Sequence, residues 1–127
     1  FEREYVRNYI HIKDVSSAFE WMIVHYETHK GEAFNVGLSD INISKLELTE
    51  RIKKYIPDFV VNQSDYYEDP DKRDYIVSNE KIESCGWKPK YSLDDGIEEL
   101  ISGYQIIINN DLSKFRNGFP IKYGQEL

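Results

Sequence analysis

Apolar side chains recur along this chain at intervals of three and four residues, the spacing of one face of a helix. The clearest stretch follows Asp14, a residue suited to cap a helix, and ends at Gly31, a stop residue. The pattern predicts an amphipathic helix between them. Its apolar face consists of Val15, Ala18, Phe19, Met22, Ile23 and Tyr26.

Capping and stop residues predict two further helices in the middle of the chain. Ser44 and Glu47 have the spacing of a capping box, and Pro57 ends the helix that they open. Ser78 is the expected cap of a short helix that Gly86 terminates.

A fourth helix is predicted to begin at Ser92 and to end at residues 109–111. The polar, charged stretch 63–74 is expected to be a surface loop. Short apolar stretches predict strands at residues 9–12, 33–36, 59–62 and 75–77. About four helices interleaved with short strands predict an α/β fold, residues 1–127 in a single domain, with no complete doubly wound sheet of the Rossmann type.

Charge limits the partners of this domain. The 127 residues include 16 Lys and Arg against 23 Asp and Glu, a formal net charge of −7. A field of this sign repels phosphate backbones, so neither nucleic acid nor an anionic membrane is an expected partner. A small anionic ligand is still compatible, because two or three arginines can create a local positive pocket.

The number of cysteines and the length of the apolar runs indicate the cellular compartment of the protein. Cys85 alone cannot form a disulfide within the chain, which favours a reducing environment and a cytoplasmic location. The longest aliphatic run, residues 106–108, is far too short to span a membrane.

Motifs for cofactors and catalysis are absent from the sequence. None of the seven glycines pairs with another at the two-residue spacing of a dinucleotide-binding turn. Tyr and Lys stand four residues apart twice, at Tyr9/Lys13 and Tyr26/Lys30, as chance predicts in so Tyr-rich a chain. We therefore expect no catalytic residue and no bound cofactor in this chain.

Two histidines raise the question of a metal site. His25 and His29 lie four residues apart on the first predicted helix, so both can face one ligand. The sequence offers no obvious third ligand, and cationic side chains are common near a helix C-terminus. We expect a solvated helix end and no metal.

Several segments, taken in order, resemble a known family. Residues 7–19, 34–37 and 73–101, with the charged loop before the last of them, are similar to the C-terminal part of extended short-chain dehydrogenase/reductases. These are the nucleotide-sugar epimerases, dehydratases and reductases, which include isomerases, lyases and oxidoreductases of carbohydrate biosynthesis. The resemblance covers about the first 105 residues of the chain.

The resemblance implies a division of labour within a longer parent protein. In this family an N-terminal Rossmann domain binds NAD or NADP and carries the catalytic Tyr and Lys, and the smaller C-terminal part closes over the nucleoside-diphosphate sugar. The chain starts at Phe1 and not at Met, so we expect a fragment that lacks the Rossmann domain and is inactive alone. Its expected partners are that domain and the sugar nucleotide; a homodimer of the parent is allowed but not implied.

The resemblance also implies substrate-binding residues. Arg7 matches an arginine that clamps the substrate diphosphate, although a surface arginine paired with a nearby acid is the alternative. In the charged loop, Asp71 matches an aspartate that lies near the nucleoside in many relatives, whereas Glu68 stands where those relatives have a phosphate-binding arginine. Either Arg73 supplies that contact or the loop takes another path, and a solvated run of charges is the alternative for both.

Two other functional classes stay open. The chain can be a non-catalytic binding or regulatory domain derived from the same fold, or an interaction domain unrelated to sugars. The sequence does not choose among nucleotides, sugars or the three reaction types. It does predict that the isolated chain exposes the apolar surface that meets the Rossmann sheet in relatives.

Overall fold

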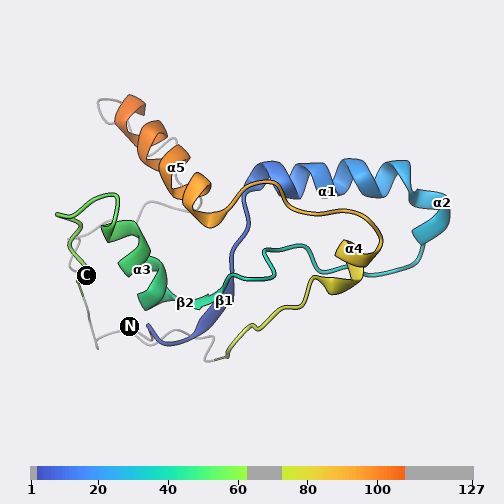
Figure 1. Ribbon diagram of the computed structural model, residues 1–127, viewed down its shortest axis with the longest axis horizontal. Coiled ribbons are helices and arrows are strands. Elements are labelled where there is room, and N and C mark those ends of the chain that lie inside the picture. Colours follow the sequence, from blue (N-terminus) through green and yellow to red (C-terminus); the bar gives the residue numbers. More distant parts are fainter. Residues whose placement is uncertain (1–2, 63–72, 108–127) are drawn as a thin grey trace, which may run out of the picture.

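The computed structural model describes residues 3–62 and 73–107, which form five helices and one two-stranded sheet (Figure 1). In chain order these elements are β1 (Val6–Asn8), α1 (Ile12–Val24), α2 (Tyr26–His29), β2 (Asn42–Ser44), α3 (Lys45–Lys53), α4 (Glu80–Ser84) and α5 (Leu93–Ile107). The α/β class is confirmed, with one more helix than expected. No helix in the described part of the chain is long and apolar enough to cross a membrane.

The sheet does not lie where the apolar stretches predicted strands. β1 and β2 pair antiparallel, with Arg7 opposite Ile43. The four predicted strands at 9–12, 33–36, 59–62 and 75–77 are wrong, because none of these residues forms a strand. The pairing instead joins three-residue segments that are too short to leave an alternating pattern in the sequence.

Side chains of two asparagines reinforce this small sheet. The Asn8 amide donates to the carbonyl oxygens of Leu38 at 2.7 Å and Ile41 at 3.0 Å. The Asn42 amide holds both the N–H and the carbonyl of Val77, at 2.9 and 3.1 Å. The predicted strand at 75–77 therefore lies extended beside the sheet without joining its ladder.

The start of α1 differs from the prediction. His11 is the N-cap, and its Nδ1 accepts the backbone N–H of Lys13 at 3.1 Å. Asp14 lies inside the helix and is fully buried, so its predicted role as cap is wrong. The Asp14 carboxylate accepts instead the backbone N–H groups of Lys90 and Tyr91. Short polar side chains at a helix start usually bind a backbone N–H of the same turn, whereas Asp14 binds the backbone of a distant segment.

Two of the other predicted helix starts are confirmed. Ser44 and Glu47 form the capping box of α3, with both reciprocal hydrogen bonds present. Ser92 accepts the N–H of Asp95 at 3.1 Å at the start of α5. Asn79 occupies the N-cap position of α4 without a capping side-chain bond, and Ser78 Oγ, one residue earlier, accepts the N–H of Glu80 at 3.4 Å. The terminator of α4, Gly86, has the expected positive φ, 108°.

The core lies between α1 and α4. Its cluster consists of the buried side chains of Ala18, Ile82 and Trp87, and the Trp87 indole donates to Ser17 Oγ at 3.1 Å. Leu38, Ile41 and Ile97 are buried outside this cluster. Only part of the predicted apolar face of α1 reaches this core. Phe19 is 69% exposed and Ile23 is 75% exposed, so the rest of that face is open to solvent.

Candidate functional site

Arg7 occupies the middle of β1, where the sheet fixes its backbone. Its side chain is half-buried, and Nη1 donates to the carbonyl oxygens of Val6 at 2.8 Å and Arg73 at 2.5 Å. One end of the guanidinium is thus held by the main chain. An arginine fixed in this way keeps its planar fork in one orientation, which favours bidentate contact with an oxyanion.

Arg73 reaches the same place from the other half of the chain. The segment that contains it runs alongside β1, since Tyr75 N–H donates to the Val6 carbonyl at 3.0 Å. In return, the Val6 N–H donates to Asp74 Oδ1 at 2.8 Å. The structure therefore brings together Arg7 and Arg73, the two arginines selected from the sequence, although 65 residues lie between them.

A tyrosine ring joins the two arginines. The guanidinium carbon of Arg7 lies 4.8 Å from the centroid of the Tyr75 ring, and that of Arg73 lies 5.6 Å from it. Tyr5 contributes a second ring, 6.0 Å from Arg7. The sequence places Tyr75 in a predicted strand, and its position two residues after Arg73 is the local sign of this contact.

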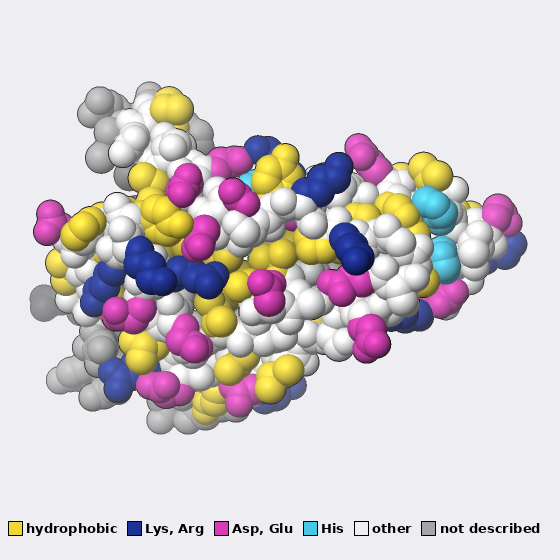
Figure 2. Space-filling view, in the orientation of Figure 1, with side chains coloured by type: hydrophobic (Ala, Val, Ile, Leu, Met, Phe, Trp, Pro, Cys, Tyr) yellow, Lys and Arg dark blue, Asp and Glu magenta, His cyan; other side chains and the backbone are white. Residues whose placement is uncertain are grey.

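Further positive charge lies close to β1. Burial raises the pKa of the Tyr9 hydroxyl, and the positive charges of Lys45 and Arg7 offset part of that rise. Lys45 and Arg7 are thus close enough to act on the same side chain. Acidic groups lie here as well, since Asp74 Oδ1 accepts the Val6 N–H, and Figure 2 shows Lys and Arg interspersed with Asp and Glu on the face that it draws.

Asp71, the third residue expected at the site, lies outside the described residues. Its role near the nucleoside stays a prediction.

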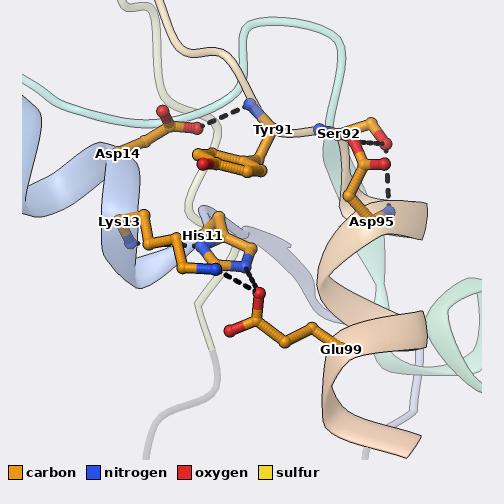
Figure 3. A network of polar contacts seen from close by, with 7 residues as sticks. All are labelled: His11, Lys13, Asp14, Tyr91, Ser92, Asp95 and Glu99. Atoms are coloured by element: carbon orange, nitrogen blue, oxygen red, sulfur yellow. Dashed lines mark hydrogen bonds and ion pairs between the residues drawn. The ribbon is translucent and has the colours of Figure 1, made fainter. Parts of the chain in front are cut away.

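A second polar cluster joins the start of α1 to α5 (Figure 3). The ring of His11 stacks on Tyr91 at 4.6 Å, and its Nε2 lies 3.4 Å from Glu99 Oε2. Lys13 Nζ donates to the same oxygen; this bond lowers the pKa of Glu99 and raises that of Lys13. Both ring nitrogens of His11 face protein groups, so we interpret the cluster as a structural clamp.

His25 and His29 lie at the end of α1 and in α2, where both rings stack on Trp21 at 4.3 and 5.3 Å. His25 Nδ1 also lies 2.8 Å from the Trp21 carbonyl oxygen. Within residues 3–62 and 73–107, no three His, Cys, Asp or Glu side chains gather as a metal site would require. The two histidines belong to an aromatic stack.

Known proteins resemble this chain over most of its length. A glycan biosynthesis protein of Haloferax volcanii, Agl12, is 32% identical over 101 residues, 78% of this chain and 31% of that protein. The dTDP-D-glucose 4,6-dehydratase of Mus musculus is 30% identical over 125 residues, 91% of this chain and 34% of the enzyme. The GDP-L-fucose synthase of Sinorhizobium fredii is 31% identical over 107 residues, 82% of this chain and 31% of the enzyme.

The chain thus spans about a third of the length of the curated relatives it matches. No protein-family model matches it. Two of the three relatives are named for the nucleotide sugars on which they act or which they make. The predicted resemblance to nucleotide-sugar enzymes is confirmed in this general form.

Proposed function

We propose that this chain is the substrate-binding part of a cytoplasmic, NAD- or NADP-dependent nucleotide-sugar epimerase, dehydratase or reductase. In this proposal Arg7 and Arg73 bind the diphosphate of the sugar nucleotide. The observation that carries the proposal is the meeting of these two arginines at one tyrosine ring, 4.8 and 5.6 Å from its centroid.

The chemistry of the pair suits a diphosphate. Two guanidinium groups provide donors to several phosphate oxygens, and each charge-assisted bond is about twice as strong as a neutral one. The anchored phosphates hold the sugar at a fixed distance from the protein. Binding energy from this non-reacting part of the substrate would position the sugar for reaction elsewhere in the enzyme.

The cofactor and the catalytic groups are placed outside this chain in our proposal. NAD or NADP, when bound, supplies hydride transfer. The glycines of this chain lack the close spacing that a dinucleotide phosphate requires, so we derive no step through the cofactor here. The contribution of the chain is to bind the diphosphate and to orient the sugar.

The exposed face of α1 supports a further domain as partner. Phe19 and Ile23 lie four residues apart on this face and are 69% and 75% exposed. Beside them is a groove of about 330 Å³, lined mainly by apolar side chains that include Val15, Met22 and Phe34. We propose that the Rossmann domain of the parent protein covers this surface, since contiguous exposed apolar area is typical of an interface.

Binding of sugar nucleotides to this chain tests the proposal. We would titrate dTDP-D-glucose and GDP-L-fucose into the unaltered chain and into Arg7→Ala, Arg73→Ala and Arg51→Ala by calorimetry. Arg51 is the matched control, because it pairs with Asp94 at 3.6 Å on another part of the surface. We expect at least one ligand to bind, and the first two substitutions to weaken binding about tenfold or more.

Two results would contradict the proposal. One is the absence of binding, or an equal loss of affinity in the Arg51→Ala control. The other is turnover of dTDP-D-glucose by the isolated chain supplied with NAD, because catalysis would then lie within these 127 residues.

A further inference from the structure

We propose that Tyr75 is a positioning residue whose ring holds Arg7 and Arg73 at the spacing needed to share one diphosphate. This inference rests on the proposed function of the arginine pair. It adds a residue that neither the sequence analysis nor the family resemblance selected.

The ring is the element common to both guanidinium groups. The carbon of each guanidinium lies within 6 Å of the Tyr75 centroid, at 4.8 Å for Arg7 and 5.6 Å for Arg73. These distances are within the range of cation–π attraction. Because both cations are attracted to the same ring, the position of that ring limits how far apart they can lie.

The backbone that carries the ring is itself fixed. Tyr75 N–H donates to the Val6 carbonyl, and the preceding residue, Asp74, accepts the Val6 N–H. Two residues further on, Val77 is held through both its N–H and its carbonyl by the Asn42 side chain. These four hydrogen bonds attach the segment to β1 and β2 on both sides of Tyr75. The ring therefore projects from a backbone that is hydrogen-bonded to both strands of the sheet.

The physical gain is pre-organisation. Two guanidinium cations brought close together repel each other, and attraction to the negative face of an aromatic ring offsets part of that repulsion before any anion binds. Arginine side chains already held together lose less rotational freedom when the diphosphate arrives. This role requires the ring and not the phenolic hydroxyl, so phenylalanine should replace tyrosine.

Three variants and the unaltered chain test the inference, with inorganic pyrophosphate and dTDP as probes. The unaltered chain, Tyr75→Phe, Tyr75→Leu and the control Tyr104→Leu would be titrated by calorimetry, with thermal melting measured in parallel. Tyr104 is a tyrosine of similar exposed character, 57% exposed on α5. We expect Tyr75→Phe and Tyr104→Leu to bind within about twofold of the unaltered chain, and Tyr75→Leu to bind about fivefold more weakly.

A double-mutant cycle separates positioning from simple packing. If the ring acts through the arginines, Tyr75→Leu should have less effect on pyrophosphate binding in the Arg73→Ala background than in the unaltered chain. A ring that only fills space would lower the melting temperature without this dependence.

The outcomes distinguish this inference from the proposed function beneath it. If Arg7→Ala loses binding but Tyr75→Leu binds normally, or if Tyr75→Phe fails to restore binding, the positioning role is overturned and the arginine site stands. If the unaltered chain and Arg7→Ala bind both probes equally, or neither binds, the proposed function fails and this inference fails with it.

Discussion

The carboxylate of Asp14 binds the backbone of Tyr91, where Oδ2 accepts the N–H at 3.0 Å. Its other oxygen accepts the N–H of Lys90 at 2.9 Å. Asp14 is completely buried in the first turn of α1, and its partners precede α5. This side chain therefore ties the segment before the last described helix to the first helix, beside the cluster of His11, Lys13 and Glu99.

Removal of this carboxylate should destabilise the fold. Asp14→Ala leaves two backbone N–H groups without their charged acceptor, and we expect the free energy of unfolding to fall by about 3 kcal/mol. Urea denaturation followed by circular dichroism measures the change. The exposed Asp40→Ala variant is the control, with an expected change below about 0.5 kcal/mol. Equal stability of the two variants would refute the structural role of Asp14.

Gly37 is required by the approach of a neighbouring side chain. A Cβ at this position would overlap Oδ1 of Asn8, whose amide holds the loop before β2. Gly37→Ala is expected to lower the free energy of unfolding by about 1–3 kcal/mol.

Gly103 supplies the opposite case for comparison. It lies within α5, and an added Cβ would meet no atom within 4 Å. Gly103→Ala should raise the free energy of unfolding by about 0.5–1 kcal/mol, because alanine favours the helix. Thermal melting of both variants measures the contrast, and a shift of the same sign in both would refute the steric argument.

The ion pair of Glu99 and Lys13 predicts loss of stability in acid. The hydrogen bond from Lys13 lowers the folded-state pKa of Glu99, so below its ordinary pKa the unfolded chain binds more protons. The stabilisation is therefore present above about pH 4.3 and is lost as the pH falls through the lower folded-state pKa. Urea midpoints between pH 3 and pH 6 should fall with acidity, and fall less steeply in Glu99→Gln. Identical slopes would contradict this contribution.

The open face of α1 predicts association of the isolated chain. At high concentration we expect concentration-dependent sedimentation and binding of an apolar dye, because Phe19 and Ile23 are largely exposed. The double variant Phe19→Gln, Ile23→Gln should sediment as a monomer with nearly unchanged stability. If the unaltered chain is already monomeric and binds no dye, this face is not an unpaired interface.

Local signals predicted most of the helices correctly. The Ser44–Glu47 capping box and the Ser92 cap act between residues three apart, so the sequence itself contains both partners. Asp14 has the same local signal, but its carboxylate accepts the backbone N–H of Lys90, 76 residues further along the chain. The strand predictions were wrong for a related reason. β1 and β2 have only three residues each, and asparagine side chains from these strands bind distant segments of the backbone.

Only some residues of the candidate site could be predicted from the sequence. The family resemblance selected Arg7 and Arg73, and the structure places them together. Tyr75 was not predicted, because its ring contacts Arg7, which belongs to a distant segment of the sequence. A spacing pattern detects only contacts between residues that are close in sequence. The exposure of part of α1 could not be predicted either. Hydrophobic periodicity identifies the apolar face of a helix but not which of its residues are covered by other elements.

The central claim is that Arg7 and Arg73 bind one diphosphate together. Nitrogen-labelled chain, titrated with dTDP and observed through the side-chain Nε–H resonances of arginine, tests this most directly. We predict that the signals of Arg7 and Arg73 shift together with a single dissociation constant, while that of Arg51 does not move. Unchanged signals from Arg7 and Arg73, or equal shifts in all three, would contradict the claim.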